Sequence, residues 1–312
     1  MTLFDDNPLH PPDENLHAQS SSDHPAEAAP PEPFAPPLAG DPISYAAVTP
    51  APQANSSLPE DLRISWSWLH LLVFVVFGVA SQIAIGIVLI AYFSADRHLT
   101  QKQLKQLFES DPRLIVGTNV LWFALIFLFL YVTLSVLRGL PFWRTLGWKR
   151  LNASPAAGKG RSWMYFFSGC GLAIFVAIAS SRVKNVEHVP IQELFKSRTG
   201  AMLLMAMAVF VAPLVEETIF RGYLYPLFAK SLGVLPGILI TGLLFGLMHG
   251  AQLGWSWGLV ALLTLVGVIF TFVRARTGTV VASFLLHLGY NSMIAFTSII
   301  ATKGFTQMPP HS

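Results

Sequence analysis

The chain has 312 residues, of which 53% are hydrophobic and 12% charged, whereas about a quarter of the residues of a soluble domain are charged. This composition excludes an ordinary water-soluble enzyme, and it is too apolar for a fully disordered protein. The single cysteine, Cys170, excludes a disulfide framework and a cysteine-cluster metal site. The net charge of +3 divides unevenly, because residues 1–62 hold ten acidic residues and no Lys or Arg, and the remainder holds 20 basic and 7 acidic residues.

Residues 1–62 have the composition of a disordered tail. They contain thirteen of the 22 prolines, and no apolar residue recurs with the period of a helix or a strand. Such a segment cannot bury enough apolar surface to offset the entropy of ordering it. We therefore predict an acidic, Pro-rich, disordered N-terminal tail. A docking tail for a partner with an aromatic groove is the alternative, with the partner unspecified.

Seven apolar segments follow the tail, and about 20 apolar residues are enough to span a bilayer as a helix. The segments are Trp66–Phe93, Leu114–Leu137, Ser162–Ser181, Gly200–Ala229, Leu235–Gly250, Trp257–Val273 and Thr279–Ile300. The fifth is the shortest. The sequence therefore predicts an all-α, polytopic transmembrane helical bundle of about seven spans.

The predicted spans divide the chain and orient it. Residues 63–199 contain three helices with their loops, residues 200–302 contain the remaining spans, and residues 303–312 form a short C-terminal tail. With seven spans, eleven basic residues fall on the side of the N-terminus and nine on the other side. Because basic residues are retained on the cytoplasmic side, this excess predicts an integral protein of the cytoplasmic membrane with its N-terminus inside.

Charged residues inside a bilayer are costly and need a reason. Six strongly polar residues fall together in the last four spans: Glu216, Glu217, Arg221, His249, His287 and Asn291. Glu217 and Arg221 are four residues apart, so they share a helix face and can pair. Glu216 is rotated by about 100° from Glu217, which leaves it free to face a cavity. His70 lies near a predicted membrane edge, where an interfacial or snorkelling position is expected.

The rise of a helix indicates that these polar groups can meet. A hairpin that turns at residues 230–234 places Glu216 and His249 each about 21 Å from the turn. A second turn on the same side, at residues 276–278, places His287 and Asn291 about 13–20 Å into the bundle. We therefore expect the polar groups at one level of the bundle. The alternative is a buried polar network that only holds the helices in register.

The polar residues favour one intramembrane chemistry over others. The predicted spans contain no Asp, which excludes an aspartyl dyad, and the chain has neither a Gly-x-Ser-Gly nor a His-Glu-x-x-His motif. A glutamate and two histidines do supply the groups that amide hydrolysis requires. The carboxylate can accept a proton from water, and His and Asn side chains can stabilise an oxyanion.

Three segments together resemble a known family. They are Glu216-Glu217-Thr218-Ile219-Phe220-Arg221-Gly222, Phe245-Gly246-Leu247-Met248-His249 and His287-Leu288-Gly289-Tyr290-Asn291. In this order they resemble the three signature motifs of the CPBP (CAAX protease and bacteriocin-processing, or Abi) intramembrane proteases, which include the type II CAAX-prenyl endopeptidases. The resemblance covers about residues 200–300. It implies that residues 200–302 are the catalytic core of an intramembrane endopeptidase.

The resemblance also implies roles for the six residues. Glu216 would activate water with the help of His249, while His287 and Asn291 would form the oxyanion site. Glu217 and Arg221 would fix the helix and the substrate terminus. The family has been described both as metalloproteases and as metal-free glutamate proteases. A zinc ion held by Glu216, His249 and His287, with one position left for water, is therefore one open possibility, and a metal-free site is the other.

The predicted partners are the lipid bilayer and a peptide or lipidated protein substrate, with no nucleic acid. Two other functions remain open. One is a non-catalytic membrane scaffold or bacteriocin-immunity protein with the same fold. The other is a transporter that uses Glu216 and the histidines as a proton relay, although the spans show no inverted repeat.

Overall fold

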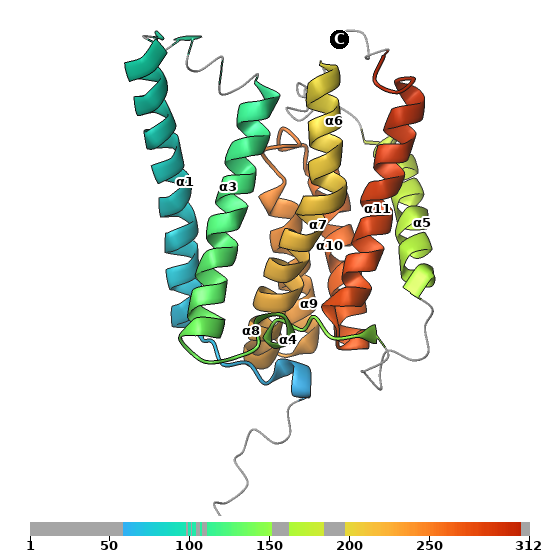
Figure 1. The fold of residues 1–312 in the computed structure, drawn as a ribbon. Helices are drawn as coiled ribbons and strands as arrows, with labels where there is room; N and C mark the ends of the chain where they lie inside the picture. The colour runs from blue at the N-terminus through green and yellow to red at the C-terminus, as the bar shows by residue number, and fades with distance from the viewer. Residues whose placement is uncertain are drawn as a thin grey trace, which may run out of the picture. The chain divides into compact units, whose positions relative to one another are not determined.

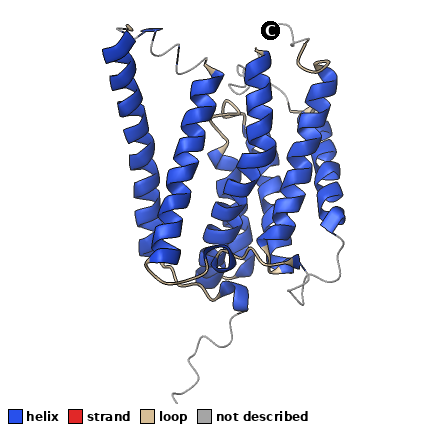
Figure 2. Ribbon diagram, viewed as in Figure 1, coloured by secondary structure: helices blue, strands red, loops and turns tan. Residues whose placement is uncertain are grey.

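The computed structural model describes residues 59–97, 99–100, 102–103, 107, 111–151, 162–183 and 197–306. The predicted N-terminal tail up to residue 58 and most of the predicted C-terminal tail lie outside the described residues. Within the described ranges the regular structure is helical, without strands (Figure 2). The predicted all-α bundle is therefore confirmed.

Six helices are long and apolar enough to cross a membrane (Figure 1). They are α1 (Trp68–Arg97), α3 (Pro112–Leu130) with its π-helical end (Tyr131–Val136), α5 (Ser162–Ser180), the broken helix Arg198–Leu232, α10 (Trp257–Thr277) and α11 (Val280–Ala301). The shorter apolar helix α9 (Val234–Met248) lies between the fourth and fifth of these. All seven predicted segments are thus helices, and the one predicted to be shortest is the one that falls below spanning length.

The fourth spanning helix is interrupted by two π-helical segments. It runs through α6 (Arg198–Ala206), a π-turn (Met207–Val211), α7 (Ala212–Glu216), a π-helix (Glu217–Leu224) and α8 (Tyr225–Leu232). Each π segment is followed at its end by a proline, Pro213 or Pro226. Because proline has no N–H and clashes with the preceding turn, it disrupts regular α-helical bonding. Such π segments often occur at functional sites, and the second one carries Glu217 and Arg221.

Glycines let two pairs of helices approach closely. Gly169 of α5 and Gly289 of α11 face each other's helix, and a Cβ at either position would overlap a backbone carbonyl of the other. Gly242 and Gly246 of α9 lie in the same way against the backbone of α10. In a bilayer the hydrophobic effect does not drive helices together, so close van der Waals packing at small residues holds them in contact. These contacts fix α11, which carries His287, and α9, whose C-terminal cap is His249.

The segment between α3 and α5 packs against one end of the bundle. It contains the short helix α4 (Phe142–Thr145) and then an irregular stretch. In that stretch the Trp148 indole N–H donates to the Thr218 hydroxyl at 3.1 Å, and the Gly147 carbonyl accepts the Val280 N–H at 2.9 Å. The segment therefore contacts both the π-helix of the fourth span and the first residue of α11.

A short 3₁₀-helix, Glu60–Leu62, ties the chain before α1 to the same end of the bundle. Asp61 pairs with the buried Arg274 of α10 at 2.9 Å. Glu60 pairs at 2.8 Å with Lys149, whose ammonium lowers the pKa of the Glu60 carboxyl. Two acidic residues at the end of the predicted tail, which was expected to reach residue 62, therefore have cationic partners that lie far away in the sequence.

Candidate active site

Glu217 and Arg221 form a fully buried ion pair on the π-helix of the fourth span. The Arg221 Nη1 atom lies 2.8 Å from Glu217 Oε1, and neither side chain is exposed. Arg221 Nη2 also donates to the Gly267 carbonyl of α10 at 3.0 Å, and the guanidinium lies 4.5 Å from the ring centre of Phe245. The pairing predicted from the spacing is confirmed. A pair buried this deeply offsets its desolvation only through such close contacts.

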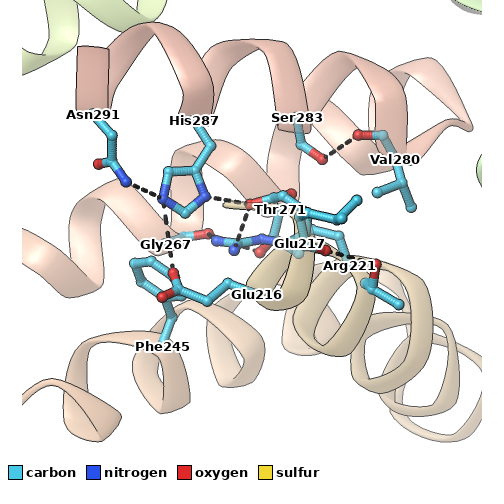
Figure 3. Close-up of polar contacts among 12 residues, drawn as sticks. Glu216, Glu217, Arg221, Phe245, Gly267, Thr271, Val280, Ser283, His287 and Asn291 are labelled. Carbon is cyan, nitrogen blue, oxygen red and sulfur yellow. Dashed lines mark hydrogen bonds and ion pairs between the residues drawn. The ribbon is translucent and has the colours of Figure 1, made fainter. Parts of the chain in front are cut away.

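His287 of α11 connects this ion pair to the rest of the site (Figure 3). Its Nδ1 atom lies 3.0 Å from Glu217 Oε1. Because an ionised carboxylate only accepts hydrogen bonds, Nδ1 carries the proton and Nε2 keeps a lone pair. Asn291 donates to that lone pair, with its Nδ2 atom 3.3 Å from Nε2. The contact between His287 and Glu217 was not predicted from the sequence, where only the common depth of the two residues hinted at it.

Asn291 is held in place by a backbone carbonyl of the fourth span. Its Nδ2 atom donates to the Ala208 carbonyl at 2.7 Å. In the π-turn the Ala212 N–H bonds to the carbonyl five residues earlier, that of Met207. In the same pattern, the N–H that would bond to the Ala208 carbonyl belongs to residue 213. Residue 213 is a proline without an N–H, which leaves the Ala208 carbonyl free for Asn291. This bond fixes which way the amide points.

Glu216 lies between the two histidines. Its Oε1 is 3.8 Å from His249 Nε2, and its Oε2 is 3.7 Å from His287 Nε2. These distances are too long for direct hydrogen bonds and suit a bridging water. His249 Nδ1 lies 2.8 Å from the Phe245 carbonyl, so its Nε2 lone pair faces Glu216. The Glu216 side chain is 18% exposed and that of Glu217 is fully buried, so the two carboxylates do face different surroundings.

The residues do not fit a three-ligand metal centre as they are arranged. Zinc requires nitrogen and oxygen ligands about 2.0–2.2 Å from the ion. In the part of the chain that the structure describes, no three His, Cys, Asp or Glu side chains converge to hold a metal ion.

His70 belongs to a separate polar cluster. Its Nδ1 atom lies 2.7 Å from the Tyr223 hydroxyl and its Nε2 atom 3.0 Å from the Thr133 hydroxyl. Thr133 donates in turn to the Phe129 carbonyl, so it accepts from His70 Nε2–H, and Nδ1 accepts from Tyr223. His70 lies in the first turn of α1, at the predicted membrane edge. It does not snorkel, because hydroxyls of two other helices satisfy both ring nitrogens.

The six apolar helices, with a polar cluster buried among them, define an integral membrane protein. Residues 198–293 match the family model described as type II CAAX prenyl endopeptidase Rce1-like. All six candidate residues lie within this segment, and the resemblance of the three motifs is confirmed. The match supports a CAAX-type protease function within the membrane. No curated protein and no solved structure matches the chain.

Proposed function

We propose that this chain is an intramembrane endopeptidase that hydrolyses peptide bonds of membrane-associated substrates, in the manner of CAAX prenyl proteases. The observation that carries the proposal is the position of Glu216 between His249 and His287, at 3.8 and 3.7 Å. The match of residues 198–293 to the CAAX prenyl endopeptidase model supports it. We also propose that the N-terminus lies in the cytoplasm, as the distribution of basic residues indicates.

Glu216 acts as the base that activates water. A water molecule between Glu216 Oε1 and His249 Nε2 can donate one hydrogen to each atom, because both present lone pairs. Its own oxygen lone pair is then free to attack the carbonyl carbon of the scissile bond. As the new C–O bond forms, Glu216 accepts a proton from the water.

His287 and Asn291 stabilise the tetrahedral intermediate. Asn291 Nδ2 keeps its bond to the Ala208 carbonyl, and its second N–H donates to the oxyanion once His287 Nε2 is protonated and no longer accepts it. The proton on Glu216 passes to His287 Nε2, 3.7 Å away, and the resulting N–H also donates to the oxyanion. Glu217, in contact with His287 Nδ1, stabilises the imidazolium. When the C–N bond breaks, the same proton goes to the leaving amine, so the step is balanced without a further donor.

The geometry favours this function over a network that only holds helices in register. Glu217 and Arg221 are wholly buried and already bind two other helices through His287 and the Gly267 carbonyl. Glu216 adds a second carboxylate that is partly exposed and makes no direct hydrogen bond with either histidine. A purely structural network does not explain why a second carboxylate lies among the membrane helices, whereas hydrolysis requires one.

Cleavage of a panel of prenylated, otherwise lipidated and unlipidated peptides by the purified full chain tests the proposal. We expect wild type and the exposed control Glu60→Gln to cleave at least one class, and Glu216→Gln to cleave none. Equal cleavage by Glu216→Gln would refute the proposal. Cleavage that a chelator abolishes and zinc restores would contradict the metal-free mechanism. A scaffold predicts instead that Glu216→Gln retains the cellular phenotype, and a transporter predicts a proton flux in liposomes that this substitution removes.

A further inference from the structure

An open cavity of about 850 Å³ lies at one end of the bundle, within the size range of small-ligand sites. Its lining includes Trp143, Trp148, Lys149, Arg150, Ser162 and Val281. None of the six candidate active-site residues lines it. The cavity is therefore a separate feature of the molecule, which the proposed hydrolysis does not use.

The lining combines positive charge with aromatic surface. Among the described residues that line it, Lys149 and Arg150 carry charge and none is acidic. Trp143 is 47% exposed, and its ring lies edge-on to that of Trp148 at 5.7 Å. Tryptophan side chains gather where hydrocarbon meets the headgroups. A ligand for this surface carries an anionic group joined to an apolar body.

The cavity lies at the level where the spanning helices end. Ser162 is the first residue of α5 and Val281 the second residue of α11. The headgroup layer of a bilayer begins at the ends of such helices. The N-terminal backbone N–H groups of α5 also favour an anion there. The position therefore suits a lipid headgroup whose acyl chains continue along the helices.

We propose that this cavity binds the headgroup of an anionic phospholipid, with the phosphodiester at Arg150 and Lys149 and the glycerol backbone against the two tryptophans. A zwitterionic lipid also carries a cation, for which the described lining residues offer no carboxylate. Lys149 already pairs with the exposed Glu60, so Arg150 contributes most of the attraction. Basic pockets between membrane helices on the cytoplasmic side recognise lipids in this way.

The cavity wall is continuous with the helix that carries the candidate active site. The Trp148 indole donates to the Thr218 hydroxyl at 3.1 Å, and that hydroxyl donates to the carbonyl of Leu214 at 2.7 Å. Thr218 directly follows Glu217 in the chain. A lipid in the cavity therefore contacts the outer face of this helix, but its binding does not depend on the proposed hydrolysis.

Native mass spectrometry of the full chain in neutral detergent tests the proposal, with phosphatidylglycerol and phosphatidylcholine of identical acyl chains as probes. We expect tighter binding of phosphatidylglycerol. Arg150→Gln should weaken that binding about fivefold, the usual contribution of one basic residue near an anionic surface, while Arg150→Lys retains it. The matched control is Arg276→Gln, because Arg276 is an exposed arginine at the C-terminal end of α10 and does not line the cavity.

Three outcomes would overturn the proposal. The first is equal binding of the two lipids. The second is an equal loss for Arg150→Gln and Arg276→Gln, which would show diffuse surface charge in place of a site. The third is displacement of phosphatidylglycerol by inorganic phosphate at equal concentration, because the ligand would then be a free anion.

Discussion

Substitution of Arg221 tests the buried ion pair at the base of the candidate site. Arg221→Met keeps most of the apolar stem of the side chain and removes the guanidinium. Three interactions disappear with it: the 2.8 Å contact with Glu217, the 3.0 Å hydrogen bond to the Gly267 carbonyl and the stacking on Phe245. Glu217 then remains as a buried charge without its cation, although it keeps its contact with His287 of α11.

The expected loss follows from that stranded charge. Removing one partner of a buried ion pair costs about 3–5 kcal/mol. The Gly267 carbonyl contributes little to the loss, because the Thr271 hydroxyl still donates to it at 2.7 Å. In the double variant Glu217→Gln with Arg221→Met no charge is stranded, and the Gln carbonyl can still accept from His287 Nδ1–H. We therefore expect the double variant to lose less than the sum of the two single variants.

Reversible unfolding of the purified chain in mixed micelles measures these free energies. The cycle should give a coupling energy of about 1–3 kcal/mol between the two residues, as expected for groups in direct contact. A loss below about 1 kcal/mol for Arg221→Met, or additive single losses, would show that the pair does not support this part of the bundle. The reasoning from burial would then be refuted.

Three further predictions concern the packing around the site and use the same unfolding measurement. Gly169→Ala should cost about 1–3 kcal/mol because the new Cβ overlaps the backbone of α11. Gly171→Ala is the control and should cost nothing, because no neighbouring atom lies within 4 Å of its Cβ. Equal losses of stability for the two variants would contradict this packing. Asp61→Asn should cost about 3 kcal/mol because it leaves the buried Arg274 without its anionic partner. The exposed Glu60→Gln should cost at most about 1 kcal/mol. A larger loss of stability for Glu60→Gln than for Asp61→Asn would contradict the anchoring of the segment before α1. Trp148→Phe should cost about 1 kcal/mol for its lost hydrogen bond, and an unchanged stability would show that this bond does not hold the loop.

Local sequence patterns were enough to predict the helices and one pair in the site. Apolar length identified all seven helical segments, because a membrane imposes its thickness on any helix that crosses it. The i,i+4 spacing of Glu217 and Arg221 predicted their ion pair, because both residues lie on one helix. Helical rise also indicated correctly that groups on three helices could reach a common level, where the structure brings Glu216 close to both histidines.

Contacts between helices were not accessible in the same way. The bond between His287 and Glu217 depends on how far each helix is rotated about its axis, and a π segment changes that rotation. The Ala208 carbonyl is free to accept from Asn291 because the residue that would donate to it in the π-turn is Pro213, which has no N–H. The pairing of Asp61 with an arginine 213 positions away has no local signal at all.

The rate of peptide cleavage by Glu216→Gln in lipid vesicles, compared with wild type under single-turnover conditions, tests the central claim most directly. The substitution keeps the shape of the side chain and removes its ability to accept a proton from water. If Glu216 is the base, the rate should fall by at least about 100-fold, while the unfolding transition stays where it is in wild type. A rate within about threefold of wild type, well short of the effect of losing a general base, would contradict the account.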